Sequence, residues 1–187
     1  MALPTDVRDP RAVDALVAAT VEAHGRLDIV VANAGVGAYG PFLELDPEQL
    51  ELMIDVNLKG VIYTARAALP HLLAAGGGDF VSLASVAGVR AFPGEAIYNA
   101  SKFGQVGFTR ALDHEMREQG VRCTSICPGG VATDFAIGTG RTEDMPELER
   151  MLSPEDVADV VMFAITRPPG MRLLTTTFRP MSEASWG

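Results

Sequence analysis

The chain has 187 residues, of which 48% are hydrophobic and 21% are charged, so it is long enough for one globular domain and too apolar to be disordered. Its formal net charge is −9 and its pI is about 4.7, so nucleic acid and anionic membrane surfaces would on average repel it. These properties favour a small-molecule ligand over nucleic acid or membrane.

Neither a leader peptide nor a membrane span is predicted, because acidic residues begin at position 6 and charges interrupt every long apolar segment. Cys123 and Cys127 stand on one predicted strand about 13 Å apart, beyond disulfide reach. We expect reduced core thiols and a cytoplasmic protein. The three histidines, His24, His71 and His114, are scattered without metal-ligand spacing, so no metal site is expected.

The first half of the chain predicts two strands and two helical segments. Residues 2–7 are typical of a short strand, and Asp9-Pro10 begins a helix that ends near His24. Residues 27–32 are apolar almost throughout, as in a parallel strand covered on both faces. Asp46-Pro47 is an N-cap followed by proline at the first helical position, and the helical pattern then runs with one break to about residue 75.

The second half continues the alternation, with strands at 79–85, 121–127 and 173–178 and helices at 94–118 and 153–166. Residues 132–152 are irregular, polar and rich in Gly, Thr and Glu, which suits a mobile lid over a substrate. The whole pattern predicts one α/β domain over residues 1–187, with a doubly wound, mainly parallel sheet in three layers.

Gly35, Gly37 and Gly40 spell G-x-G-x-x-G directly after the strand at 27–32. A phosphate-binding fingerprint opens a helix within its own loop, because the helix N-terminus holds the phosphate. Here the next helix begins only at Asp46, 11 residues after Gly35, and Asp55, which has the spacing of the ribose-binding acid, lies inside a helix. We therefore do not interpret these glycines as a phosphate site.

Tyr98 and Lys102 are four residues apart on a predicted helix and share one face, about 6 Å apart along its axis. An ammonium group favours the ionised form of a nearby phenol, so the pair is a candidate general acid/base; the alternative is a solvent-facing pair without a role. Ser85 ends the strand at 79–85, on the sheet edge where open α/β folds bind ligands. It could donate a hydrogen bond to a substrate oxygen, although such a serine alone is more often a turn residue.

Five motifs in order resemble those of the short-chain dehydrogenase/reductase family: "ANAG" at 32–35, "VNLKG" at 56–60, "SLASVAG" at 82–88, "YNASK" at 98–102 and "CPGGVAT" at 127–133. The resemblance runs from Asp6 to at least Val161. It implies a Rossmann-like fold and an NAD(P)-dependent oxidoreductase that moves a hydride between nicotinamide and a carbonyl or secondary alcohol.

The resemblance also implies roles for individual residues. Tyr98 would exchange the proton, Ser85 would polarise the substrate, Lys102 would hold the nicotinamide ribose and lower the pKa of Tyr98, and Asn57 would anchor a water linking Lys102 to solvent. Besides Tyr98 and Lys102, the implied cofactor contacts are Asp6 and Val7 at the adenine, Asn33, Ala34 and Gly35 at a ribose, and Pro128, Gly129, Val131 and Thr133 at the nicotinamide.

The sequence departs from the family pattern at its start. Members begin with a strand, a T-G-x-x-x-G-x-G turn and a helix, then another strand and helix, before the Asp-Val motif that here stands at positions 6 and 7. The resemblance therefore implies a sheet without its first two strands and helices, and without the segment that selects NAD or NADP. Either the strand at 2–7 closes against 27–32, or that edge is left exposed.

Three explanations of this departure remain open: a start site assigned too late, a truncation that has lost activity, and a fragment completed by another chain. The alternative function is accordingly an inactive fragment that acts only as an interaction module. The family's contacts imply a homodimer or homotetramer through the helices at 57–75 and 94–118, where Val106, Phe108 and Leu112 could serve an interface or the core. Arg179-Pro180 resembles the branch that includes dehydrogenases of serine and other 3-hydroxy acids, without fixing the substrate.

Overall fold

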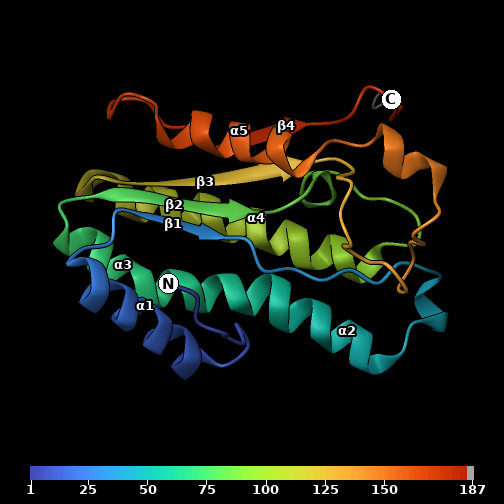
Figure 1. Cartoon of the computed structure of the whole chain (residues 1–187), viewed down its shortest axis with the longest axis horizontal. Coiled ribbons are helices and arrows are strands. Elements are labelled where there is room, and N and C mark those ends of the chain that lie inside the picture. The colour runs from blue at the N-terminus through green and yellow to red at the C-terminus, as the bar shows by residue number, and fades with distance from the viewer. Residues whose placement is uncertain (185–187) are drawn as a thin grey trace.

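Four parallel strands form the sheet of the computed structural model, which describes residues 1–184 (Figure 1). The strands are β1 (Ile29–Ala32), β2 (Gly78–Leu83), β3 (Val121–Pro128) and β4 (Thr175–Phe178), and they lie side by side in chain order. In the register, Ala32 is opposite Ser82, Ser82 opposite Ser125, and Ser125 opposite Thr175. The predicted parallel sheet is confirmed, with four of the five predicted strands.

Among the described residues, five α-helices connect and flank the strands: α1 (Pro10–His24), α2 (Pro47–Ile54), α3 (Gly60–Ala74), α4 (Ala96–Met116) and α5 (Pro154–Ile165). Their ends follow local chemistry. The Asp9 side chain accepts a hydrogen bond from the Arg11 N–H at the start of α1, and Gly25 ends this helix with a left-handed φ of 80°. Ser153 and Asp156 form a capping box at the start of α5.

The predicted break in the second helical segment is a π-helical turn, Asp55–Lys59, between α2 and α3. There the Gly60 N–H reaches back to the Asp55 carbonyl, five residues away, instead of the usual four. This one-residue insertion places Asn57 in the bend, where its side chain is fully buried.

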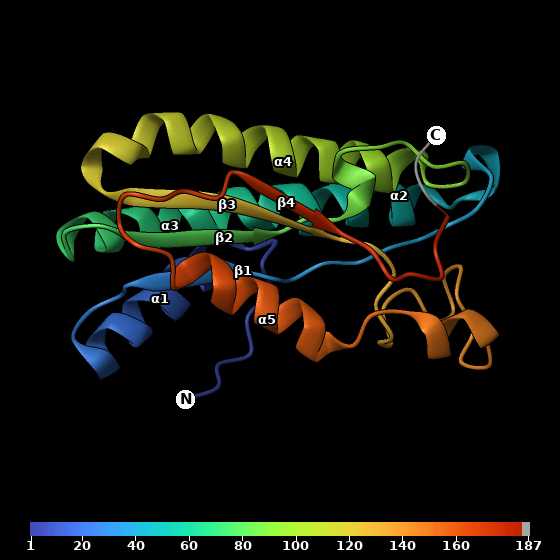
Figure 2. The same ribbon diagram turned by 90° about the horizontal axis from the view of Figure 1, so that it is seen from above.

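The helices cover the two faces of the sheet unequally. α3 packs on β1 and β2, α4 packs on β3, and α1 packs on α3, whereas α5 lies on the opposite face (Figures 1 and 2). Alternate residues of one strand serve the two cores: Phe80 packs toward α3 and α4, and Val81 packs toward α5. The fold is therefore the predicted three-layer, doubly wound, Rossmann-like arrangement.

From the sequence, three apolar residues of α4 could belong either to the core or to a subunit interface. Val106 and Leu112 are buried, and Phe108 packs against the core between the sheet and the helices. Cys123 and Cys127 are buried free thiols on β3, as predicted.

The strand predicted at residues 2–7 is wrong. These residues are irregular and end in a turn in which the Asp9 N–H donates to the Asp6 carbonyl. A strand persists only where a neighbour satisfies its backbone groups, and Pro4 offers no N–H to such a ladder. Instead the chain passes beside α3, with Val7 packed so closely against Gly60 that a Cβ at position 60 would lie 2.8 Å from the Val7 side chain.

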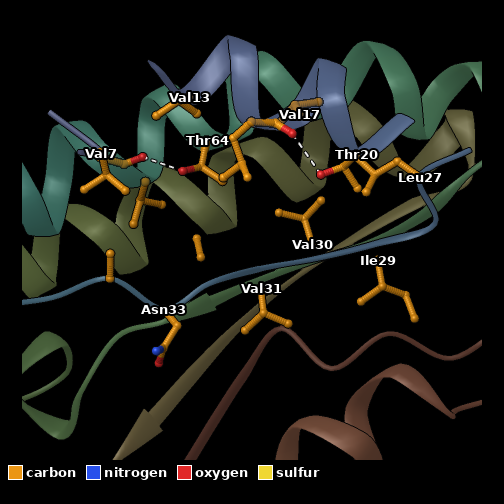
Figure 3. Close-up of a pocket in the computed structure, with 15 residues that line it drawn as sticks. Val7, Val13, Val17, Thr20, Leu27, Ile29, Val30, Val31, Asn33 and Thr64 are labelled. Atoms are coloured by element: carbon orange, nitrogen blue, oxygen red, sulfur yellow. Dashed lines mark hydrogen bonds between the residues drawn. The ribbon is translucent and has the colours of Figure 1, made fainter. Parts of the chain in front are cut away.

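β1 consequently lies at an edge of the sheet. Of the two alternatives for this strand, closure by residues 2–7 or an exposed edge, the structure has the exposed edge. The side chains of Ile29 and Val31 are 44% and 43% exposed. This exposure is high for apolar residues of a parallel strand, which is usually covered on both faces. An apolar groove of about 330 Å³ follows this edge. In Figure 3, Val30 points toward Val13 and Val17 of α1, while Ile29 and Val31 point to the other side of the strand.

Within residues 1–184, no helix combines the length and the apolar composition needed to cross a membrane.

Candidate active site

A cavity of about 880 Å³ opens at the carboxyl ends of β1, β2 and β3. This is the edge at which open α/β sheets bind their ligands, because the loops that follow the strands diverge there. Most of the predicted site residues line it: Asn33, Ala34, Gly35, Ser85, Tyr98, Lys102, Pro128, Gly129, Val131 and Thr133.

Tyr98 stands in the first turn of α4 and is 6% exposed. Ser85 lies two residues after the end of β2, and its Oγ accepts a hydrogen bond from the Ala87 N–H at 3.1 Å, which fixes the side chain at the start of a short 3₁₀ turn. Burial raises the pKa of Tyr98 to about 12, while hydrogen bonding from Ser85 acts in the opposite direction. The pair thus places one hydroxyl beside a phenol that is protonated at neutral pH.

Lys102 lies one turn further along α4, with its Nζ 5.7 Å from the centroid of the Tyr98 ring. It is 3% exposed, and this burial lowers its pKa to about 8. Nζ donates hydrogen bonds to the Leu83 carbonyl and to Gln105 Oε1, each at 3.0 Å. The ammonium is therefore held at the end of β2, beneath the phenol.

Gln105 was missed by the sequence reasoning although it fixes Lys102. Its Nε2 donates to Ser82 Oγ at 2.7 Å and to the Leu83 carbonyl at 2.9 Å, so the side chain is fully buried between helix and strand. The signal was its spacing, since Gln105 lies seven residues after Tyr98 and three after Lys102, on the same helix face. A buried glutamine on that face indicates a polar partner.

Asn57 does not line the cavity, but it joins the loop after β1 to α4, and both of these segments line the cavity. Its Oδ1 accepts from the Val36 N–H at 2.8 Å, and its Nδ2 donates to the Val36 carbonyl at 2.9 Å and to Ser101 Oγ at 3.0 Å. The π-helical turn is thereby fastened to the loop after β1 and to α4.

The glycine loop after β1 holds the backbone close to this centre. A Cβ at Gly35 would lie 3.5 Å from Asn57 Oδ1 and 3.7 Å from Lys102 Nζ. The loop passes through Gly40, whose φ is +157°, into Pro41, and the next α-helix begins only at Pro47. No helix N-terminus meets these glycines, in agreement with our interpretation of the motif.

Asp6 and Val7 are not brought to the cavity. Asp6 forms an exposed ion pair with Arg8 at 2.6 Å, and the hydrogen bonds from Arg8 lower the pKa of Asp6 to about 2. Val7 lines the apolar groove beside β1. Asn33 and Ala34 line both the groove and the cavity, so the two hollows meet at the end of β1.

The segment 132–152 forms one wall of the cavity. Its ends are joined by two backbone hydrogen bonds, from Ala132 N to the Leu152 carbonyl and from Leu152 N to the Gly130 carbonyl. Arg141 of this segment donates to the Val131 carbonyl at 3.1 Å. Charged side chains also reach the cavity from Glu95 and Glu183, where desolvation raises the pKa of Glu95 and Glu183 accepts from the Gly130 N–H.

Tyr39 is a second site residue that the sequence did not reveal. It lies within the glycine loop, and its ring meets the Tyr98 ring edge to face, with centroids 5.4 Å apart. Phe135, from the segment 132–152, lies on the other side, 5.9 Å from Tyr98. Contacts between residues 59 and 37 positions apart leave no periodic signal in a single sequence.

Comparison with known proteins decides the family. The family model described as short chain dehydrogenase matches residues 1–144. The chain belongs to the short-chain dehydrogenase family. An uncharacterized oxidoreductase of Staphylococcus aureus (strain USA300) is 34% identical over 179 residues, which are 96% of this chain and 75% of that protein. Another from Staphylococcus epidermidis is 34% identical over 176 residues, covering 94% and 74%.

Solved structures of this family superimpose closely on the chain. A serine dehydrogenase in its closed form, complexed with NADP+, has a TM-score of 0.88 at 30% identity and covers 98% of this chain and 77% of its own. An alcohol dehydrogenase of the archaeon Thermococcus sibiricus, complexed with 5-hydroxy-NADP, has a TM-score of 0.87 at 28% identity, with coverage of 98% and 75%. The chain thus spans about three quarters of the length of these relatives.

Proposed function

We propose that this short-chain dehydrogenase is an NAD(P)-dependent oxidoreductase that interconverts a carbonyl and a secondary alcohol, with Tyr98 as general acid and base. The observation that supports this most is the convergence of Ser85, Tyr98 and Lys102 on one cavity at the carboxyl edge of the sheet. The solved relatives that hold NADP or NAD support a nicotinamide cofactor without favouring either form.

The chain's own residues suit the nicotinamide end of such a cofactor. Glycine at position 35 leaves the backbone open beside Lys102 Nζ, and Pro128, Gly129, Val131 and Thr133 form the wall beyond β3. Lys102 and the Asn33–Gly35 turn would hold the ribose. The bound cofactor would supply or accept the hydride.

The proton is handled by Tyr98. In the direction of reduction its phenol gives a proton to the forming alkoxide, and in oxidation its phenolate accepts the proton of the alcohol. Ser85 donates a hydrogen bond to the same substrate oxygen and so fixes the reacting carbon. Lys102, buried one turn below, supplies positive charge near the phenolate, and Asn57 holds the loop and α4 in place around it.

We further propose that residues 132–152 cover the substrate as a lid, since Phe135, Arg141, Met145 and Met151 all line the cavity. Asp6 and Val7 remain the proposed contacts at the adenine end. We also propose a cytoplasmic homodimer or homotetramer that contacts through α3 and α4, where Phe103 is 46% exposed.

Titration of the chain with NADH and NADPH, followed by the fluorescence of the reduced nicotinamide, tests cofactor binding directly. Turnover is then followed by the absorbance of the reduced nicotinamide with a panel of ketones, secondary alcohols and 3-hydroxy acids. Because a positioned general acid contributes about 10²- to 10⁴-fold, Tyr98→Phe should lower kcat/KM at least about 100-fold.

Tyr63→Phe is the matched control, because it removes the same atom from a half-buried tyrosine of α3 and should leave turnover unchanged. Equal activity of the two variants would overturn the role of Tyr98. If neither cofactor binds, the alternative of an inactive interaction module replaces the proposal for this chain.

A further inference from the structure

The Lys102 ammonium and the Gln105 side-chain amide form a closed ring of hydrogen bonds with the Leu83 carbonyl at the end of β2. Lys102 Nζ donates to the Leu83 carbonyl and to Gln105 Oε1, each at 3.0 Å. Gln105 Nε2 donates to the same Leu83 carbonyl at 2.9 Å. A carbonyl oxygen has two lone pairs, so Leu83 can satisfy both donors, and the ring ties α4 to β2.

The orientation of the Gln105 amide follows from this ring. The Leu83 carbonyl can only accept a hydrogen bond, and the Lys102 ammonium can only donate one. The amide must therefore turn Nε2 to Leu83 and Oε1 to Nζ, because a flipped amide would pair two acceptors on one side and two donors on the other. Ser82 Oγ lies 2.7 Å from Nε2 and accepts its second proton. Gln105 is fully buried, so its amide holds this orientation away from solvent.

The Lys102 ammonium has three N–H donors, of which Leu83 and Gln105 take two. Within residues 1–184 the third N–H has no hydrogen-bond partner. Lys102 lines the cavity, and Gln105 stands behind it. Glycine at position 35 leaves open space beside the ammonium, since a Cβ there would lie 3.7 Å from Nζ. The third N–H is therefore left for an acceptor that enters the cavity.

The ammonium depends on neutral acceptors, because the titratable groups around it carry no negative charge at neutral pH. Burial lowers the pKa of Lys102 to about 8. The titratable groups that face it are the Tyr98 phenol on α4 and the Cys127 thiol on β3, and burial raises the pKa of both. The oxygens of Leu83 and Gln105 therefore take the place of the carboxylate that usually accompanies a buried charge.

We propose that Gln105 is a positioning residue for cofactor binding: it holds Lys102 in its charged form at the end of β2 and leaves one N–H of the ammonium directed into the cavity. A hydroxyl oxygen of the nicotinamide ribose would accept this N–H. The inference rests on the proposed function, in which Lys102 holds that ribose. Gln105 lies outside the motif "YNASK", which ends at Lys102.

The chain offers a direct test because it contains two lysines, Lys59 and Lys102. Labelling lysine with ¹³C at Cε gives two signals in an NMR titration, and Lys59→Arg identifies them. Gln105→Leu removes the amide and should lower the Lys102 midpoint by about one pH unit, the size expected for a lost hydrogen bond to a charged group. Gln105→Glu should raise the midpoint, because a carboxylate then stands beside the ammonium.

Thr109→Val is the matched control. Thr109 lies one turn further along α4, is equally buried, and donates its hydroxyl to the backbone carbonyl of Gln105 at 2.9 Å. This substitution removes a buried polar atom from the same helix without touching Nζ, so the Lys102 midpoint should stay where it is. A general disturbance of α4 would move the midpoint in the same direction in every variant. An unchanged midpoint in Gln105→Leu overturns the inference.

The wild-type protein supplies a test that needs no variant to fold. The chain contains three glutamines, Gln49, Gln105 and Gln119. The side-chain ¹⁵N signal of Gln105 should shift at the Lys102 midpoint, because Oε1 loses a charged donor there. The signals of Gln49 and Gln119, whose side chains are hydrogen-bonded to other residues, should not shift. A Gln105 signal that does not change at the Lys102 midpoint contradicts the hydrogen bond.

Cofactor binding measures the consequence for the ribose. Gln105→Leu should raise the Kd of NADH and of NADPH by the same factor, about tenfold, because both contain the nicotinamide ribose. Thr109→Val should leave both values unchanged, as followed by the fluorescence of the reduced nicotinamide. Equal Kd values for Gln105→Leu and the wild type overturn the contact with the ribose. If neither cofactor binds the wild type while the Lys102 midpoint shifts as expected, the proposed function fails and the role of Gln105 in holding the charged lysine stands.

Discussion

The side-chain amide of Asn57 is paired with both backbone polar groups of Val36, at 2.8 Å from the Val36 N–H and 2.9 Å from its carbonyl. This pairing imitates one rung of a β-ladder, made by a side chain in a π-helical turn. Asn57 is fully buried, so water does not replace its hydrogen bonds to these partners when the side chain is changed.

Asn57→Asp should therefore destabilise the protein strongly. The substitution replaces the Nδ2 donor with an oxygen, which leaves the Val36 carbonyl facing an acceptor and removes the bond to Ser101 Oγ. We expect the free energy of unfolding to fall by at least about 2 kcal/mol, because the half-buried Val36 carbonyl and the buried Ser101 hydroxyl both lose a donor. Urea unfolding followed by circular dichroism measures it. Asn33→Asp, at an exposed position of the same loop, should change it by less than about 0.5 kcal/mol, and equal losses would contradict the argument.

Lys102 makes stability depend on pH in an uncommon direction. Its pKa in the folded protein is about 8, below the ordinary 10.5, because burial disfavours the ammonium. Below pH 8 both the folded and the unfolded states carry the proton, and the full cost of burial is present. Between pH 8 and 10.5 the folded state releases its proton first, so this cost disappears as the pH rises.

Lys102→Met should accordingly be more stable than the wild type at pH 7. This advantage should disappear as the pH rises toward 10.5. Between pH 7 and 10.5, the difference in free energy of unfolding between Lys102→Met and the wild type should change by about 3 kcal/mol. This value follows from the shift of the Lys102 pKa from 10.5 to about 8. Urea unfolding at intervals from pH 7 to 10 measures it. The only other lysine, Lys59, has its pKa raised because its ammonium donates a hydrogen bond to the Asp55 carboxylate, so the difference for Lys59→Met should stay flat over this range.

The two cysteines of β3 should be unreactive in the folded state. Burial raises the pKa of Cys123 to about 12 and that of Cys127 to about 11, and the thiolate is the reacting form. At pH 8 we expect labelling by a maleimide to be at least about 100-fold slower than in urea, counted by mass spectrometry. Fast labelling of either thiol in the native protein would contradict its buried position on the strand.

The exposed edge of β1 should promote self-association. Val31 is 43% exposed on a strand whose outer backbone groups face the groove, and unpaired edges of this kind template strand addition. Val31→Lys should slow aggregation at constant stability, as seen by light scattering during incubation. Leu43→Lys removes a more exposed apolar residue, at 92%, away from the sheet. If it slows aggregation equally, general surface hydrophobicity is the cause and the strand edge is not.

The order of elements could be predicted because it depends on local patterns. Asp9, Gly25 and Ser153 mark helix ends, and β2 and β3 are segments of strand length that each follow a glycine turn. The strand at 2–7 was wrongly predicted because a strand depends on a partner, which its own residues do not specify. Likewise Ser85, Tyr98 and Lys102 stand in recognisable motifs, whereas Gln105 and Tyr39 are defined by contacts that only the folded chain brings about.

The π-helical turn at Asp55–Lys59 makes the length of this helical segment critical. An α-helix advances by about 100° per residue, so deleting one residue there would restore regular helical pairing and rotate α2 by that angle against α3. Asn57 would then turn away from Val36, and the loop that bears Tyr39 would lose its anchor. The number of residues in this segment therefore cannot be altered without releasing the loop from the acid/base centre.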